Sequence, residues 1–156
     1  KIAADLYSYN INPSEISRIM FDTKSRGRIE LERMVLDSAE FHFDGKCMLL
    51  TATNTMKEKT GCTDNDLEGV AVISRSVEGV LAGVSVKEKA DGSYKISVRT
   101  YPPLNASEIC KKLGGGGHQN AAGCILNGDI KEIKKQILEV IEKALEESNA
   151  GTSSGK

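Results

Sequence analysis

A run of four glycines, Gly114, Gly115, Gly116 and Gly117, constrains the fold more than any other stretch of this 156-residue sequence. Glycine loses more backbone entropy on ordering than any other residue, so an ordered run needs a physical reason. One reason is close approach: without β-carbons, several backbone N–H groups can point at one spot, which suits a phosphate or another anion. His118 follows directly, so its imidazole belongs to the same surface. The run therefore predicts an anion-binding loop.

Other glycine-rich motifs do not match this stretch. A P-loop would end in Gly-Lys-Ser/Thr, and a dinucleotide fold would show Gly-x-Gly-x-x-Gly spacing; neither pattern is found here. A flexible linker is the alternative, but linkers carry more serine and charge, and apolar patterned segments flank the run closely. We expect the run to belong to a folded domain.

The patterns on both sides of the glycines predict an α/β (α+β) fold, with a mixed β-sheet flanked by helices. The predicted strands cover residues 41–43, 46–52, 80–86, 94–100 and 123–126. Asp-Gly pairs at 44–45 and 91–92 predict two hairpins. One helix is predicted over 29–38, and others begin at capping residues Asn12, Thr55, Thr63, Asn105 and Asp129. In the strand over 94–100, Lys95, Ser97 and Arg99 share one face.

Composition narrows the classes of ligand and compartment. Net charge is −1, with 21 basic and 22 acidic residues, which favours a small or short phosphorylated ligand over long nucleic acid. No apolar run reaches the roughly 18 residues of a membrane span, and no signal peptide is present, so we expect a cytoplasmic protein. The four cysteines form no C-x-x-C pair, which predicts small buried hydrophobes rather than a zinc site.

The stretch GGGGHQNAAG, residues 114–123, resembles the signature of the DHH-associated domain, the C-terminal domain of DHH-family phosphoesterases. That family includes RecJ-like exonucleases, exopolyphosphatase-related proteins, and oligoribonucleases that degrade nanoRNA and dephosphorylate 3′-phosphoadenosine 5′-phosphate. A looser version of the glycine motif occurs at the C-terminus of alanyl-tRNA synthetases. The resemblance covers about residues 1–147. It implies a helical connector over 1–40 from an absent catalytic domain and a substrate-binding domain over 41–147. Residues 148–156 are tail-like and expected to be disordered.

The resemblance also implies which residues bind substrate. Besides the four glycines and His118, it points to Arg99 in the pattern Ser-Val-Arg, because a guanidinium matches phosphate oxygens with two parallel hydrogen bonds. An exposed arginine in a weak ion pair is the alternative for Arg99, and bracing of the loop is the alternative for His118. Arg75 resembles a further family motif, but it could equally pair with Glu78.

Hydrolysis in the family uses two divalent metal ions held by clustered aspartates and histidines. This sequence has two histidines, far apart, and no Asp-His-His. Asp64-Asn65-Asp66 suits a helix start better than a metal site. We therefore expect no catalytic residue and no metal ligand in this chain, no hydrolysis by the chain alone, and manganese or magnesium in the absent domain.

The predicted function is binding of a short RNA or DNA oligonucleotide or a phosphorylated nucleotide, within a phosphoesterase that hydrolyses nanoRNA or 3′-phosphoadenosine 5′-phosphate. A homodimer is a further expectation. Two alternatives stay open: a fragment of a RecJ-like single-stranded DNA exonuclease, and a non-catalytic nucleic-acid-binding or dimerisation module like the synthetase C-terminal domain.

Overall fold

The computed structural model describes residues 12–67 and 69–153 and confirms the predicted α/β fold. Its centre is a six-stranded mixed sheet with the strand order β1-β2-β3-β4-β6-β5. β2 and β3 run parallel, and the other neighbouring strands run antiparallel. The strands are β1 (Glu40–His42), β2 (Cys47–Ala52), β3 (Ala82–Glu88), β4 (Tyr94–Thr100), β5 (Gly116–His118) and β6 (Ala121–Leu126).

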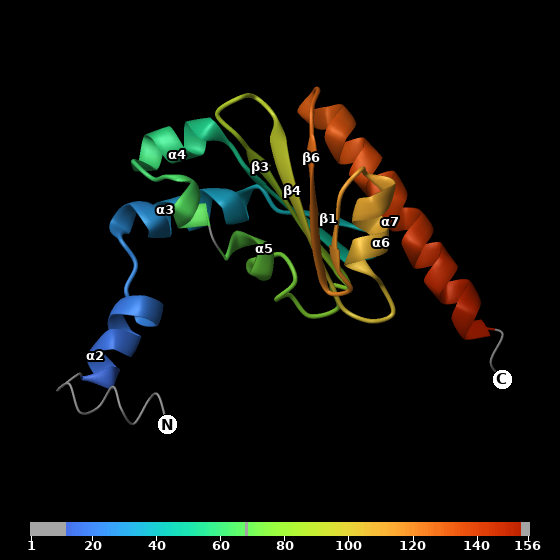
Figure 1. Ribbon diagram of the computed structural model, residues 1–156, viewed down its shortest axis with the longest axis horizontal. Coiled ribbons are helices and arrows are strands. Elements are labelled where there is room, and N and C mark those ends of the chain that lie inside the picture. Colours follow the sequence, from blue (N-terminus) through green and yellow to red (C-terminus); the bar gives the residue numbers. More distant parts are fainter. Residues whose placement is uncertain (1–11, 68, 154–156) are drawn as a thin grey trace.

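Helices lie on both faces of this sheet (Figure 1). The helices are α2 (Pro13–Ser17), α3 (Arg26–Asp37), α4 (Asn54–Thr60), α5 (Val70–Ile73), α6 (Ala106–Lys112) and α7 (Ile130–Ser153). A π-helical turn, η1 (Arg18–Asp22), follows α2, and a 3-10 turn, η2 (Asp64–Leu67), precedes α5. α6 and α7 lie on one side of the sheet and α3, α4 and α5 on the other, while α2 lies away from the strands (Figure 1).

Both predicted hairpins are confirmed. β1 and β2 are joined by a turn in which Phe43, Asp44 and Gly45 have positive φ. β3 and β4 are joined by a turn in which Gly92 N–H donates to the Lys89 carbonyl at 3.0 Å. Two predicted helix caps are also confirmed, since the side chains of Asn12 and Asn105 each accept hydrogen bonds from the first turn of the following helix.

Two helix starts were placed wrongly. Thr53, not Thr55, caps α4, because its hydroxyl accepts from Met56 N–H at 3.3 Å. The turn that follows Thr63 is only the short η2, in which the Asp66 carboxylate accepts from Thr63 N–H at 2.8 Å. α5 then begins separately after Gly69, whose φ of 96° breaks the helical path.

The ends of the chain differ in part from expectation. The tail expected over 148–156 is helical as far as Ser153, where α7 ends, and residues 154–156 lie outside the described residues. Of the connector expected over 1–40, residues 1–11 also lie outside, and the described part is largely helical through α3.

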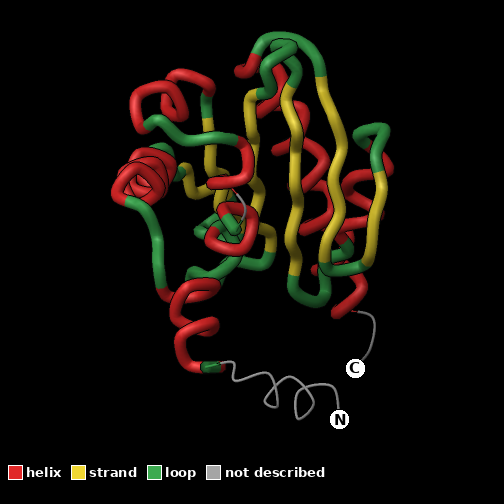
Figure 2. Tube along the Cα trace, turned by 60° about the vertical axis from the view of Figure 1, so that its left-hand side comes forward, coloured by secondary structure: helices red, strands yellow, loops and turns green. Residues whose placement is uncertain are grey.

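The two faces of the sheet are covered to different extents. On one face, strand side chains such as Val84, Val98 and Cys124 pack against α6 and α7 in the larger core cluster. On the other face, Met48 and Leu50 of β2 pack with α3, η2 and α5 in a second cluster, to which no described residue of β4, β5 or β6 belongs. We call the second face over these three strands the open face. Its side chains are Lys95, Ser97, Arg99, Gly116, His118, Ala121, Gly123 and Ile125. Figure 2 views the sheet from this side, with α6 and α7 behind the strands.

Candidate functional site

The glycine run is divided between a helix cap and a strand, and it does not form the single loop that was predicted. Gly114 N–H donates to the Lys111 carbonyl at 3.1 Å, and Gly115 N–H donates to the Cys110 carbonyl at 2.8 Å. With Gly114 at a φ of 78°, these bonds form a Schellman cap on α6. The chain then enters β5. The N–H groups of Gly114 and Gly115 therefore bond to α6, so these two are not among the several donors expected to point at an anion.

Packing explains why two residues of the run, Gly115 and Gly117, are glycine. A β-carbon on Gly115 would collide with the carbonyl oxygen of Gly123, and one on Gly117 would lie 2.6 Å from the Ala122 α-carbon. Gly123 is restricted in the same way by the Ile96 carbonyl oxygen, at 2.8 Å. A β-carbon on Gly114 or on Gly116 would meet no described atom within 4 Å, but Gly114 has a φ of 78°, whereas Gly116 has no positive φ. Gly116 thus has unfilled space on the open face.

Sheet register brings Arg99 and His118 into one row. Arg99 pairs with Ala121, and Ala121 pairs with His118 on its other side. Paired residues point to the same face, so both side chains lie on the open face with only the methyl group of Ala121 between them. Since neighbouring strands are about 4.8 Å apart, the backbones of Arg99 and His118 are separated by about 10 Å. The register therefore places two side chains suited to phosphate within reach of one ligand.

The hairpin that carries His118 is fixed to its surroundings. The Gln119 carbonyl accepts hydrogen bonds from Ala106 N–H at 2.7 Å and from the Thr100 hydroxyl at 3.1 Å. The Asn120 carbonyl accepts from Thr100 N–H at 3.2 Å. These bonds hold the turn to the end of β4 and to the start of α6, while the His118 side chain stays exposed.

Arg99 is half-buried and has no acidic partner in the described part of the chain. Its Nη1 donates to the Val98 carbonyl at 3.2 Å, which leaves other guanidinium N–H groups without a hydrogen-bond acceptor among described residues. The ion pair considered as an alternative role for Arg99 is therefore not formed here. An unpaired guanidinium beside an exposed histidine favours an anionic ligand.

Arg75 lies at the same end of the open face. It follows α5, and its guanidinium carbon lies 5.1 Å from the centre of the Tyr101 ring, which is cation–π distance. Its backbone is close to Gly83, the residue of β3 that pairs with Arg99. The alternative pairing with Glu78 is not found among the ion pairs of the described residues. The structure thus gathers all three predicted side chains, Arg75, Arg99 and His118.

Comparison with known proteins settles the family. The family model of the DHHA1 domain matches residues 46–147. This chain belongs to the DHHA1 domain family. The resemblance deduced from the glycine–histidine stretch is thereby confirmed.

Three proteins similar to this DHHA1 domain are named as phosphoesterases or as related to one. The bifunctional oligoribonuclease and PAP phosphatase NrnA of Thermus thermophilus is 33% identical over 147 residues, 93% of this chain and 43% of that protein. The cyclic-di-AMP phosphodiesterase GdpP of Geobacillus thermodenitrificans is 33% identical over 72 residues, 46% of this chain and 11% of that protein. The crystal structure of an exopolyphosphatase-related protein from Bacteroides fragilis superposes with a TM-score of 0.75 at 28% identity, covering 94% of this chain and 42% of that chain. The chain spans less than half the length of each of these proteins.

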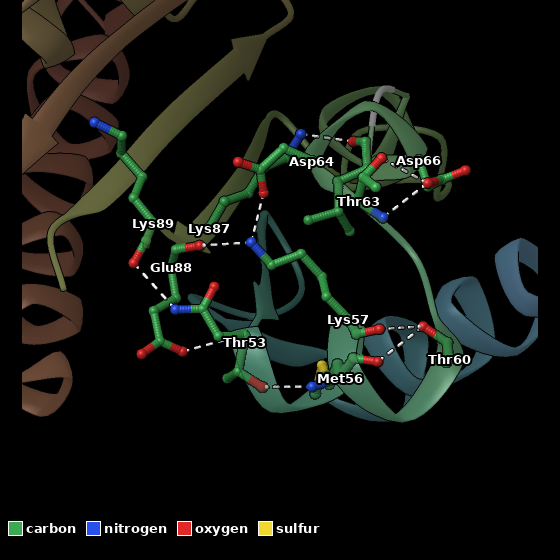
Figure 3. A network of polar contacts seen from close by, with 12 residues as sticks. Thr53, Met56, Lys57, Thr60, Thr63, Asp64, Asp66, Lys87, Glu88 and Lys89 are labelled. Carbon is green, nitrogen blue, oxygen red and sulfur yellow. Dashed lines mark hydrogen bonds and ion pairs between the residues drawn. The ribbon is translucent and has the colours of Figure 1, made fainter. Parts of the chain in front are cut away.

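Manganese and magnesium do not fit the described residues of this DHHA1 domain. Both ions prefer oxygen ligands, whereas the open face offers arginine, lysine and histidine nitrogens. The two aspartates considered in the sequence, Asp64 and Asp66, have protein partners: Asp64 pairs with the Lys57 ammonium, and Asp66 accepts from the Thr63 hydroxyl (Figure 3). No three His, Cys, Asp or Glu residues are grouped to hold a metal ion within 12–67 and 69–153.

Two residues of the open face and one residue beside it were not selected as site candidates from the sequence. Lys95 and Ile125 lie at the far end from His118, and Tyr101 lies under Arg75. Strand alternation had placed Lys95 on the face of Arg99, so that signal was available in the sequence. Nothing local connects Tyr101 with Arg75, because the fold alone brings them together.

Of the helices in the described residues, none combines the length and apolar character that crossing a membrane requires.

Proposed function

We propose that this DHHA1 domain is the substrate-binding domain of a DHH-family metal-dependent phosphoesterase, and that it binds short oligonucleotides or phosphorylated nucleotides. NanoRNA and 3′-phosphoadenosine 5′-phosphate are the proposed substrates. The similarity to the Thermus relative, which is named as an oligoribonuclease and PAP phosphatase, supports this choice.

One observation carries the proposal: Arg99 and His118 flank Ala121 in a single row of an otherwise small-residue surface. Arg99 offers a charged fork, His118 an exposed ring nitrogen, and Gly116 leaves space that a side chain would fill. Arg75 adds a second guanidinium beside this row. A phosphate held there would be bound by several donors from separate strands.

In this proposal the described residues bind and orient the substrate and take no part in bond cleavage. Holding one end of a short phosphorylated chain sets the position of the next phosphoester bond, and positioning of this kind contributes strongly to rate. Hydrolysis, with the manganese or magnesium expected of the family, is assigned to another part of the whole protein. The chain alone is accordingly proposed to cleave nothing.

Titration of 3′-phosphoadenosine 5′-phosphate and of a 5′-phosphorylated diadenylate, followed by amide chemical shifts, tests the proposal. Charged hydrogen bonds are worth roughly 1.5–3 kcal/mol, so Arg99→Ala is expected to weaken binding about tenfold or more. Gly116→Val is expected to weaken it as well, because the branched side chain would occupy the space above β5. The matched control is Lys135→Ala, which removes an exposed lysine from α7 on the covered side of the sheet.

The shifts should map to residues 116–121, to Arg99 and to the end of α5. Unfolding midpoints of Arg99→Ala and wild type should be similar, since Arg99 forms no ion pair with the described residues and its removal breaks only the hydrogen bond to the Val98 carbonyl. The proposal is wrong if the shifts map elsewhere and neither Arg99→Ala nor Gly116→Val changes the affinity.

A further inference from the structure

The open face extends well beyond the row of Arg99 and His118. Two residues further along β4 and β6, Ser97 pairs with Gly123, and after two more, Lys95 pairs with Ile125. Arg99 and Lys95 are four residues apart on one strand, and at about 3.4 Å per residue this is about 14 Å. Between them the surface carries only Ser97, Ala121, Gly123 and Gly116. The open face is thus an elongated surface of small residues with a cationic side chain near each end.

A cavity marks the Lys95 end of this surface. Its volume of about 380 Å³ is large enough for part of a nucleotide. It is lined by Lys89, Lys95, Ile96, Gly123, Cys124 and Ile125. Ile125, the last but one residue of β6, is 57% exposed, which is high for isoleucine. The cavity therefore combines an aliphatic floor with two ammonium groups, a composition that suits a sugar or base with a phosphate beside it.

Among the described residues, Lys95 is the charge at this end that has no partner, since Lys89 forms an ion pair with Asp91 at 3.3 Å. Lys87 and Lys95 are direct partners across β3 and β4, and like charges directly opposite each other destabilise a sheet. Lys87 reaches away to donate to the Leu67 carbonyl at 2.6 Å. Lys95 is exposed and has no carboxylate within ion-pair distance in the described part of the chain. In Figure 3 the Lys89 side chain also extends away from the network around Lys57.

We propose that Lys95 and Ile125, with Lys89, form a second subsite that binds the following nucleotides of a short single-stranded oligonucleotide whose terminal phosphate lies at Arg99 and His118. This inference rests on the proposed function and specifies its ligand: an oligonucleotide long enough to reach Lys95 from Arg99. A mononucleotide bound at Arg99 would not extend over the 14 Å or so between the two cations. Lys95 would contact a backbone phosphate, and Ile125 would contact a base or sugar.

Affinity as a function of ligand length tests the subsite. The probes are 5′-phosphorylated oligoadenylates of two and of four nucleotides, titrated calorimetrically into wild type, Lys95→Ala, Ile125→Ser, Arg99→Ala and the control Lys135→Ala. Lys95→Ala and Ile125→Ser should leave dinucleotide affinity within about twofold, yet weaken the tetranucleotide by roughly threefold to tenfold. For the tetranucleotide, Lys95→Ala should also reduce the slope of log affinity against log salt by about 0.7, the value for one phosphate contact on a single strand.

The possible outcomes separate this inference from the proposed function. If Arg99→Ala weakens both ligands while Lys95→Ala weakens neither, the second subsite is refuted and the proposed function stands. If Lys95→Ala weakens both ligands equally, or Lys135→Ala has the same effect, the lysine acts only through general charge and the subsite is likewise refuted. If wild type binds neither ligand, the proposed function fails, and the second subsite fails with it.

Discussion

The backbone nitrogen of Arg75 lies so close to Gly83 that a β-carbon on that glycine would approach it to 2.6 Å. Gly83 is the β3 neighbour of Arg99, so the end of α5 rests directly on the sheet beside the proposed phosphate site. This contact, together with the Tyr101 ring, determines where the Arg75 guanidinium lies.

Replacing Gly83 by alanine should therefore displace the end of α5. The new methyl group would also lie 2.5 Å from the Ser74 carbonyl carbon, and overpacking of this kind costs about 1–3 kcal/mol. Urea unfolding should show that loss, and affinity for 3′-phosphoadenosine 5′-phosphate should fall as Arg75 moves. Gly116→Ala is the matched control for stability, because its methyl group meets no described atom within 4 Å. Equal stability of the two variants would contradict the close contact.

Tyr101 is expected to position Arg75 for the ligand. A cation–π contact at an exposed site is worth about 0.5–1 kcal/mol, so Tyr101→Leu should weaken nucleotide binding by about twofold to fivefold. Tyr101→Phe keeps the ring face and should restore most of the affinity. In an Arg75→Ala background, Tyr101→Leu should have no further effect, which calorimetry of the double variant would reveal. A full additive loss there would mean that Tyr101 acts independently of Arg75.

The start of α4 can be tested by comparing two threonines. Thr53→Ala should lower the free energy of unfolding by about 1 kcal/mol, because it removes the hydroxyl that accepts from Met56 N–H. Thr55→Ala should change it by less than about 0.5 kcal/mol, since that side chain is exposed within the helix. Chemical denaturation of both variants measures the difference. A larger effect at Thr55 would restore the helix start expected from the sequence.

The four thiols should differ sharply in reactivity. Cys47, Cys110 and Cys124 are buried, whereas Cys62 is only partly buried. Burial also raises the pKa of Cys47 to about 12, so almost none of it is thiolate, the reactive form, at pH 8. Iodoacetamide at pH 8 should thus modify Cys62 first in the native protein and all four cysteines in denaturant, as peptide mass spectrometry would show. Native labelling of Cys47 ahead of Cys62 would contradict this burial.

Local signals in the sequence predicted the local structure well. The alternation of Tyr94 to Thr100 correctly separated the core-facing side chains from Lys95, Ser97 and Arg99, because it depends only on strand geometry. The side-chain cap of Asn105 was equally readable. The parallel pairing of β2 with β3 was not predicted, since it depends on how α4, η2 and α5 pack between these strands along the chain.

Non-local contacts explain what was missed in the candidate site. The glycine run was interpreted as a loop because neither the Cys110 carbonyl that accepts from Gly115 nor the strand that pairs with Gly116 can be seen from composition. Arg75 was selected by resemblance, and only the fold shows that it lies beside Arg99 and over Tyr101. Residue types were thus predictable, and their arrangement was not.

The Schellman cap on α6 limits which insertions and deletions this segment can tolerate. The cap bonds of Gly114 and Gly115 determine where the chain leaves the helix, and the pairing with Ala121 determines where His118 enters the sheet. Side chains alternate along a strand, so one glycine more or fewer between these two points would turn the imidazole toward α6 and α7. Such a change would leave the motif recognisable by composition and yet remove the histidine from the open face. During evolution, the length of the glycine run is therefore under as strong a constraint as its residue type.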